Sequence, residues 1–314
     1  MNMTKQFFEV SAGQSGMRLD QFLAQQFPEQ TRSFFQKQIR DGNVSINEQS
    51  GHLKAGSILR EKDRVSIAFA EPKPLEALPE NIPLDILYED EDLLVINKPK
   101  GMVVHPAHGH DSGTLVNALL WHCRDDLSGI NGVLRPGIVH RIDQDTTGSL
   151  IICKNDRSHN FIAEQLAAHS ITRVYEAIVT GNLKEDTGSV DAPIGRHPTD
   201  RKKMAVNSRS GKRAVTHYRV LHRFAGPAGV FTHIECRLET GRTHQIRVHM
   251  ASIGHPLLGD EIYGKGAKSI LGVPLQGQVL HARTIGFIHP TTKEYMEFEA
   301  PLPGYFMQLL QKLG

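Results

Sequence analysis

The sequence has few cysteines, a single tryptophan and no long apolar run. Its 314 residues include three cysteines, Cys123, Cys153 and Cys236, and no two of them form a Cys-x-x-Cys pair. This argues against a disulfide framework and against a thiolate zinc site, and it suits a reducing compartment. No apolar stretch approaches the ~18 residues that a membrane-spanning helix needs, and the N-terminus has no apolar signal segment. We therefore expect a cytoplasmic protein that neither crosses a membrane nor is exported.

The rest of the composition is that of a globular protein. Hydrophobic residues make up 39% of the chain and charged residues 22%, and the formal net charge is only +2. The length predicts about two domains. One segment is unbalanced: between residues 196 and 223 nine basic residues face one acid, Asp200. Such a run is often a solvated face, but an uncompensated basic cluster also attracts phosphate backbones.

The first seventy residues predict a small basic unit. Apolar residues in 18–27 and 32–40 have helical spacing, and short β patterns occur at residues 7–10, 44–47 and 65–69. Residues 71–83 contain four prolines and no apolar periodicity, which predicts a semi-rigid linker. For the first seventy residues, the alternative to an RNA-binding unit is a small packing domain with an ordinary share of Lys and Arg.

Beyond the linker, strand and helix patterns alternate along the chain. Strands are predicted at 84–88, 93–98, 150–153, 171–179, 214–221, 231–238, 279–282 and 295–298. Helices are predicted at 114–122, 160–169, 246–250 and 305–313, with Thr240 or Thr243 available as the cap of the third of them. This order predicts an α+β domain, and we expect a monomer.

A polar loop between two predicted strands carries the densest chemistry. The stretch 137–148 begins with the predicted strand end at Gly137–Val139 and precedes the buried strand 150–153. Its polar part holds His140, Arg141, Asp143 and Asp145. Arg141 can neutralise Asp143 and keep it ionised, as a nucleophile or base requires. Asp, Thr and Gly are also ordinary turn residues, and the loop alone does not decide between these interpretations.

A metal-dependent hydrolase or phosphotransferase is a rival interpretation of the same loop. Its ligands would be His140, Asp143 and Asp145. The loop lacks the phosphate-binding glycines of a P-loop, however, and the chain has no His-Glu-x-x-His motif.

Several stretches together resemble one enzyme family. The loop 137–148 resembles the H-R-[LI]-D-x-x-T-[ST]-G signature of the RluA-type pseudouridine synthases. Residues 173–177 (Arg-Val-Tyr-Glu-Ala) resemble their second motif, residues 240–249 with 254–260 their third, and residues 97–106 a further one. Residues 18–20 and 42–47 resemble the S4 RNA-binding domain. Ile142 stands where Leu is usual and Arg173 where Lys is frequent, and both substitutions are mild.

The resemblance covers nearly the whole chain and points to the RluC/RluD branch. It implies an S4-like RNA-binding domain over residues 1–70, the linker 71–83, and a catalytic domain over 84–314 with a mixed, largely antiparallel sheet. The implied activity is isomerisation of uridine to pseudouridine in 23S ribosomal RNA, free or in a pre-assembled large subunit, without cofactor or metal. The alternative is a non-catalytic RNA-binding or ribosome-assembly factor that keeps only the fold.

The resemblance also assigns residues. It implies Asp143 as the catalytic carboxylate, Arg247 as its basic partner and Tyr175 as the aromatic residue beside the uracil. Without the resemblance, the favoured interpretation of Tyr175 is a half-buried core tyrosine. It implies that Arg141 fills the stack vacated by an extruded base, whereas His140 is more typical of a loop-orienting residue and Asp145 of a structural one. Substrate-binding residues are expected at His140, Arg141, Arg201, Lys202, Lys203, Arg242, His244 and Gln245.

Overall fold

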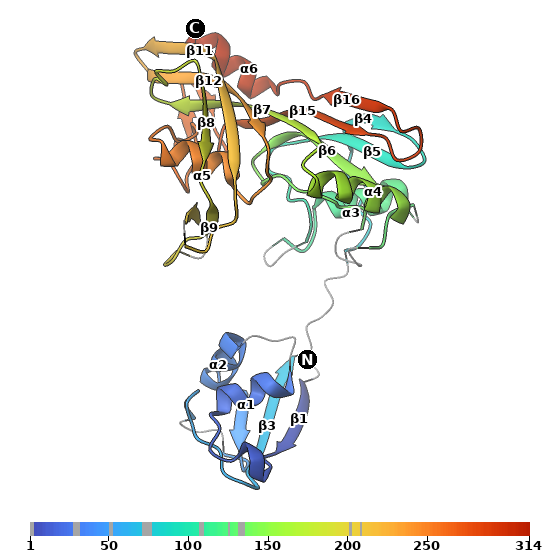
Figure 1. Ribbon diagram of the computed structural model, residues 1–314, viewed down its shortest axis with the longest axis vertical. Helices are drawn as coiled ribbons and strands as arrows, with labels where there is room; N and C mark the ends of the chain where they lie inside the picture. Colours follow the sequence, from blue (N-terminus) through green and yellow to red (C-terminus); the bar gives the residue numbers. More distant parts are fainter. Residues whose placement is uncertain are drawn as a thin grey trace. The chain divides into compact units, whose positions relative to one another are not determined.

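The chain folds into two compact units. The computed structural model describes residues 3–27, 32–49, 53–70, 77–106, 110–124, 126–130, 136–200, 203–207 and 209–314. The first unit is Met1–Pro74 and the second Leu75–Gly314 (Figure 1). Arg201 and Lys202 lie outside the described residues.

The first unit packs two helices on a small sheet. Strands β1 (Met3–Glu9), β3 (Arg64–Ala70) and β2 (Val44–Ile46) pair antiparallel in that order. Beside them lie a 3₁₀ turn (Ala12–Gln14) and helices α1 (Leu19–Gln26) and α2 (Arg32–Arg40). Phe22 and Phe35 from the helices are fully buried with Ile67 of the sheet. Asp20 is also fully buried and accepts hydrogen bonds from Arg18 and Arg32, which ties the two helices together.

The second unit is built on one large mixed sheet. Its strand order in the described part is β4-β5-β6-β15-β7-β12-β11-β8, with β16 also paired to β15. Only β6 and β15 pair in parallel. The elements are β4 (Ile86–Glu89), β5 (Leu93–Lys98), α3 (Leu115–Cys123), β6 (Thr147–Cys153), α4 (Asp156–Ala167), β7 (Thr172–Thr180), β8 (Thr187–Asp191), β9 (Ile194–Arg196), β10 (Met204–Val206), β11 (Val215–Gly226), β12 (Gly229–Leu238), α5 (Gln245–Ser252), β13 (Ser269–Ile270), β14 (Val273–Pro274), β15 (Leu280–Ile288), β16 (Tyr295–Glu299) and α6 (Gly304–Leu313). The expected mixed, largely antiparallel sheet is confirmed.

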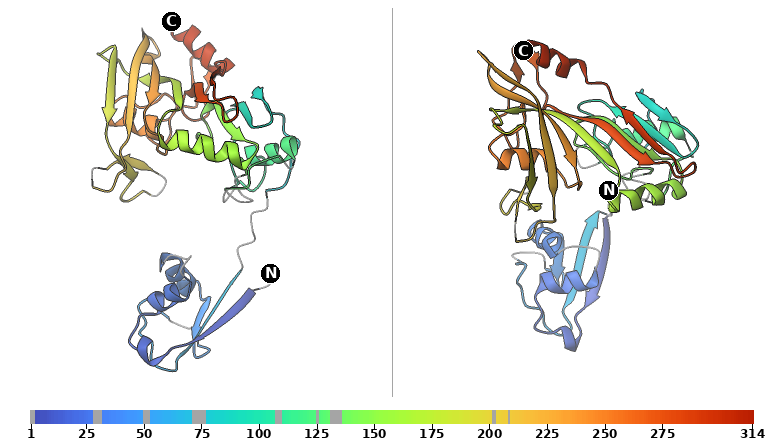
Figure 2. Two further views of the ribbon diagram at one scale, coloured as in Figure 1. Left: turned by 45° about the vertical axis from the view of Figure 1, so that its right-hand side comes forward. Right: turned by 45° about the horizontal axis from the view of Figure 1, so that its top comes forward.

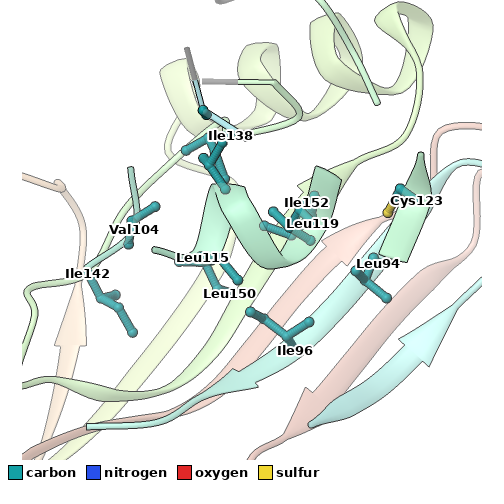
Figure 3. Packing of buried hydrophobic residues seen from close by; sticks show 12 residues of the cluster. Leu94, Ile96, Val104, Leu115, Leu119, Cys123, Ile138, Ile142, Leu150 and Ile152 are labelled. Atoms are coloured by element: carbon teal, nitrogen blue, oxygen red, sulfur yellow. The ribbon is translucent and has the colours of Figure 1, made fainter. Parts of the chain in front are cut away.

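Both faces of β5 and β6 are buried, because alternate residues pack on different helices. Helix α3 covers one set, which includes Ile96 and Leu150, and these residues meet Leu115 and Leu119 in one cluster (Figure 3). The intervening residues of the two strands pack with Ile162 of α4. This burial explains why these strands are continuous apolar runs rather than alternating ones.

Helices α5 and α6 cover the other end of the sheet. Ile246 and Met250 of α5 pack on Ala177 of β7 and Ile234 of β12, whereas Phe306 of α6 lies in the cluster that holds the intervening residues of those strands. Figures 1 and 2 show β11, β12 and α5 at one end of this unit and β4, β5 and α3 at the other. Strand β7 runs between these two ends.

Three local expectations differ from the structure. Residues 77–83 of the expected linker belong to the second unit, where Ala77 is buried and Asn117 of α3 donates a hydrogen bond to the Leu78 carbonyl. The expected strand end at Gly137–Val139 is reduced to one β-bridge, between Ile138 and Ile152. Neither threonine caps α5: its N-cap is His244, which has a left-handed backbone (φ 57°) and makes no side-chain cap bond.

Among the described residues, no helix combines the length and the apolar character that a membrane crossing requires.

Candidate active site

The loop that carries Asp143 is fixed from both sides. Ile142 is buried in the cluster under α3 (Figure 3). The next residue but one, Gln144, accepts hydrogen bonds at its carbonyl from the Lys98 ammonium (2.9 Å) and from the Gly101 amide (3.0 Å). Thr146 then accepts a hydrogen bond from Gln278. With its neighbours anchored in this way, the Asp143 side chain is held in one place while 18% of it remains exposed.

Lys98 is a completely buried cation that holds the loop through carbonyl oxygens alone. Its ammonium also donates to the Pro99 and Met102 carbonyls, each at 2.8 Å. Burial lowers the pKa of Lys98 to about 7, although the nearby carboxylates Asp145 and Asp143 oppose the shift.

Arg247 lies between two carboxylates. Its Nη1 donates to Asp143 Oδ2 at 2.8 Å, while Nε and Nη2 donate to the two oxygens of Asp260 at 2.7 and 3.0 Å. Asp260 is fully buried and also accepts the backbone amides of Ile262 and Tyr263. Burial alone would raise the pKa of Asp260, but the bonds from Arg247 outweigh it and lower that pKa. The two bonds to Asp260 therefore hold the guanidinium in a fixed plane, and its Nη1 donates to Asp143.

Arg247 reaches this position because Gln245 anchors the start of α5. The Gln245 amide accepts hydrogen bonds from Thr240 Oγ1 and the Arg242 amide, and it donates to the Val215 carbonyl and to Thr216. Its polar atoms are thus used within the protein. Gln245 borders the pocket, but the structure makes it a support for the loop 240–244.

His244 faces Asp143 from the same loop. Its Nε2 lies 3.8 Å from Asp143 Oδ1, and its Nδ1 is 2.8 Å from the hydroxyl of Tyr263. That hydroxyl also accepts the Met204 amide, so it links the β9–β10 hairpin to the site. Burial lowers the pKa of His244, against the opposing effect of Asp143. The imidazole of His244 beside the Asp143 carboxylate is therefore neutral at pH 7.

Tyr175 of β7 completes an inner pocket that Asp143 and Arg247 also line. Burial raises the pKa of Tyr175, with Arg173 acting against the shift, so its hydroxyl stays protonated. The pocket is lined by Arg141, Ile142, Asp143, Thr146, Tyr175, Leu238, Arg242, His244, Gln245, Ile246, Arg247 and Leu280.

The remaining loop residues differ in their surroundings. Arg141 is exposed and borders both the inner pocket and a larger outer pocket beside it. His140 accepts the Ile151 amide at Nε2, and burial, with a smaller contribution from Arg173, lowers its pKa to about 3. Its ring is therefore neutral and fixes the loop to β6. Asp145 of the same loop lies next to Gly277, and burial raises its pKa.

The basic run 196–223 is compensated in part, because three of its nine basic residues form ion pairs. Arg213 pairs with Glu239, Arg219 with Glu235, and Arg223 with Asp186. The acids come from β12, from the segment after it and from the segment before β8, so the pairing appears only when the strands align. Lys203 is partly exposed at the β9–β10 hairpin. Arg242 lines both pockets, and its Nε donates to the Arg213 carbonyl.

The metal-site interpretation of the loop is not supported by its geometry. Within the described ranges, no three His, Cys, Asp or Glu side chains are grouped as a metal ion would need. His140 uses its Nε2 for a backbone amide instead.

Comparison with protein families agrees with this site. Residues 92–252 match the model of the family described as RNA pseudouridylate synthase, and residues 17–65 match that of the S4 domain. The chain belongs to the RNA pseudouridylate synthase family and is an isomerase that carries an N-terminal S4 domain.

Its similarity to individual relatives extends over almost the full length. An uncharacterised RNA pseudouridine synthase, YlyB of Bacillus subtilis, is 50% identical over 97% of this chain and 96% of its own. The ribosomal large subunit pseudouridine synthase D of Zymomonas mobilis is 48% identical over 95% and 94%, and that of Pseudomonas aeruginosa 46% over 99% and 97%. The segments 196–198 and 204–206 favour the D members of the RluC/RluD branch as well, and this placement is confirmed.

A solved structure supports the fold independently. Human RNA pseudouridylate synthase domain containing 1 aligns with a TM-score of 0.55 at 25% identity, and the alignment covers 78% of this chain and 97% of that one.

Sequence reasoning missed three residues that shape the site. Asp260 stands inside a quoted motif but received no role, and Tyr263 and Lys98 were not singled out. No local pattern could have found Asp260 as the second partner of Arg247, because the pairing depends on how the segment after α5 turns back. The role of Lys98 was easier to predict than that of Asp260, because a lysine that ends a continuous apolar strand must form its hydrogen bonds within the protein.

Proposed function

We propose that this enzyme converts uridines of the large-subunit (23S) ribosomal RNA to pseudouridine. Support comes from relatives near 46–48% identity that are named for the large ribosomal subunit, and from the N-terminal S4 domain. The observation that carries the catalytic assignment is the ion pair between Arg247 and Asp143, 2.8 Å long, in a pocket that Tyr175 also lines.

Asp143 is the catalytic carboxylate in this proposal. The reaction breaks the N1–C1′ bond, turns the uracil and joins C5 to C1′, so the C5 proton is lost and N1 gains one. A carboxylate can act on the extruded nucleotide as nucleophile or base. No second acid is needed to protonate the departing base, because uracil leaves as a stabilised anion. Arg247 donates a hydrogen bond to Asp143, and Asp260 holds Arg247 in place.

Tyr175 holds the uracil and closes the pocket. Its ring can stack on the base, and its hydroxyl, which stays protonated, can donate to a carbonyl or exchange a proton near C5. Together with Ile142 and Leu280 it gives the inner pocket an apolar part that keeps water from the broken bond.

A uridine within a stem must leave its stack to reach Asp143, at a cost of a few kcal/mol. Arg141 is exposed at the mouth of both pockets, where its planar guanidinium can occupy the vacated place. His244 and Arg242 then contact the extruded nucleotide. Arg201, Lys202 and Lys203 contribute phosphate contacts, and we propose that the protein acts as a cytoplasmic monomer.

The experiment is pseudouridine mapping by carbodiimide modification in 23S RNA from cells that lack the gene. Wild-type protein should restore specific pseudouridines. Asp143→Asn should restore none, while its dissociation constant for the same RNA stays within about threefold, because an amide keeps the shape but not the charge. Restoration by Asp143→Asn would refute the catalytic assignment. A gene deletion that changes no pseudouridine would favour the assembly-factor alternative. Comparing naked 23S RNA with large subunits as substrates identifies the form on which the enzyme acts.

A further inference from the structure

Two arginines line the outer pocket without an ion-pair partner among the described residues. Arg173 lies on β7, and Arg242 lies in the loop that follows β12. Both line the outer pocket, which adjoins the inner one: Arg141, Asp143 and Tyr175 border both. A ligand that places one part beneath Tyr175 therefore extends past these two guanidiniums.

Arg173 is largely buried, yet no described residue supplies a carboxylate to pair with it. Its Nη2 donates to the Glu239 carbonyl at 3.4 Å, and its Nε is buried without a hydrogen-bond partner among the described residues. Across the same residues no Asp or Glu oxygen lies within 4.0 Å of it. A buried donor left unpaired is costly, and in native structures such groups usually mark a ligand or a functional site.

The carboxylate of Glu239, whose carbonyl accepts the Arg173 hydrogen bond, is paired with other residues. The carboxylate of Glu239 accepts a hydrogen bond from Arg213 (3.0 Å) and lies 2.7 Å from His217 Nε2. Only the backbone carbonyl of Glu239 serves Arg173. Arg242 is held in the same way, because its Nε donates to the Arg213 carbonyl at 3.0 Å. Both guanidiniums are therefore held by backbone carbonyls, which leaves their positive charge unneutralised.

The backbone is shaped to admit Arg173. A Cβ atom at Gly241 would come within 2.5 Å of Arg173 Nη1. Glycine at 241 lets the loop approach the guanidinium closely, next to Arg242. Burial lowers the pKa of Arg173, and the charge of Arg242 adds to that shift, so the two cations lie close enough to repel. An anion bound between them would remove this repulsion.

We propose that Arg173 and Arg242 form a binding site for one phosphodiester of the RNA, the one adjoining the uridine whose base enters the inner pocket. This inference rests on the proposed function and adds a named subsite to it. A phosphodiester suits the site because a guanidinium donates two parallel N–H bonds to phosphate oxygens. The phosphate would fix the nucleotide's sugar beside Asp143, and Arg173 is then a binding residue.

The test uses a stem-loop RNA that contains the uridine mapped in the 23S experiment. In two further RNAs a neutral methylphosphonate replaces the phosphate on the 5′ or the 3′ side of that uridine. For wild type, one of the two should weaken binding about 10-fold or more, as expected for loss of a charge-assisted bond. Arg173→Gln should weaken binding of the natural RNA by a similar factor. The affinity of this variant should fall little further on the methylphosphonate RNA that binds wild type weakly.

Non-additivity of this kind identifies the pair of groups that touch. Additive losses at both linkages, or natural-RNA binding by Arg173→Gln equal to wild type, would overturn the proposal. The matched control is Arg157→Gln at the start of α4, where the arginine is 67% exposed and pairs with Asp92. It should respond to methylphosphonate as wild type does.

A second variant keeps the positive charge of Arg173 but changes its position. Gly241→Ala should displace the Arg173 guanidinium and reproduce the binding loss, whereas the double variant with Arg173→Gln should lose no more than either alone. Equal binding by Gly241→Ala and wild type would contradict the geometry.

A readout independent of turnover separates this proposal from the proposed function. The slope of log affinity for a 23S fragment against log salt concentration should fall by about 0.7 in Arg173→Gln, the value for one single-strand phosphate contact. An unchanged slope sinks the phosphate site even if the enzyme is active. A reduced slope in a protein that forms no pseudouridine would leave the site standing and reject the activity.

Discussion

At the scale of single residues, the site depends on how charges are paired where water is scarce. Arg247 is 5% exposed and is shared between Asp143 and Asp260, so removing either carboxylate leaves a buried cation with half its partners. One carboxylate faces the pocket and the other faces the protein interior. The interior one is therefore the positioning group, and its effect on chemistry must pass through Arg247.

We expect Asp260→Asn to slow catalysis without preventing RNA binding. The amide still accepts the backbone bonds of Ile262 and Tyr263, but it no longer holds Arg247 as an ion pair. Misplacement of a catalytic group by about 1 Å costs on the order of 100-fold in rate, and loss of a buried ionic partner costs about 3 kcal/mol of stability. Single-turnover rates and dissociation constants measured on one RNA separate these effects.

The control for that experiment is Asp41→Asn, which removes an exposed ion pair with Lys37 in the first unit. It should leave rate and stability nearly unchanged. Wild-type turnover in Asp260→Asn would show that Arg247 needs no second carboxylate.

His140 predicts a pH dependence of stability. Its pKa is about 6.5 when unfolded and, mainly through burial, about 3 in the folded protein. Between these two pKa values the ring is protonated in the unfolded chain but not in the folded protein. The free energy of unfolding therefore falls as the pH is lowered from about 6.5 to about 3, by up to about 1.4 kcal/mol per pH unit. In His140→Gln, the stability deficit relative to wild type should shrink from pH 7 to pH 5.

Urea denaturation followed by fluorescence measures this effect. The only tryptophan, Trp121, lies in α3, so its emission reports the second unit alone. His110→Gln, at an exposed histidine, should show a difference from wild type that does not vary with pH. A constant deficit in His140→Gln would mean that the buried ring is not the titrating group.

At the scale of elements, the parallel contact of β6 with β15 fixes the end of the loop that carries Asp143. Gly148 pairs with Ala282 and has a φ of 109°. A Cβ there would come within 2.7 Å of the Ala282 nitrogen and 2.8 Å of its carbonyl carbon. Backbone atoms cannot yield as a flexible side chain does, so any substituent separates the strands.

Gly148→Ala should destabilise the second unit by about 3 to 5 kcal/mol, from backbone strain plus overpacking. Gly113→Ala is the matched control, since it also has positive φ (68°) but nothing within 4 Å of its Cβ position. It should cost only the strain, about 1 to 2 kcal/mol. Equal losses in the two variants, measured through Trp121, would show that the strand contact tolerates a methyl group.

At the scale of the whole molecule, the two units have separate cores. The buried cluster of the first contains residues 10–67 only, and the clusters of the second begin at Ala77. A chain of residues 77–314 should therefore fold, and its turnover at saturating RNA should stay within about threefold of the full protein.

Its affinity should fall by at least about 10-fold, because loss of a tethered RNA-binding unit removes an effective-concentration advantage. Circular dichroism establishes the fold before kinetics are measured. A folded fragment that cannot turn over saturating RNA would show that the first unit takes part in the chemistry, and unchanged affinity would show that it does not bind this RNA.

The sequence by itself determined the local elements and singled out the loop that carries Asp143. Apolar spacing placed α1, α3 and the continuous strands β5 and β6, because periodicity and turn chemistry act over a few residues. Motif resemblance singled out Asp143, Tyr175 and Arg247. Where the spacing was weak, as at the β9–β10 hairpin, or where a side chain had a distant partner, as at Thr240, prediction failed.

Only the tertiary structure decided which charges meet. Asp143 and Arg247 are 104 residues apart, and the second partner of Arg247, Asp260, comes from a segment with no matching local signal. Alignment of β11 with β12 neutralised Arg219 in the basic run, while Arg173 remained without a carboxylate. The reason is physical: burial and ion pairing depend on which strands pair across the sheet, and no window of neighbouring residues contains that information.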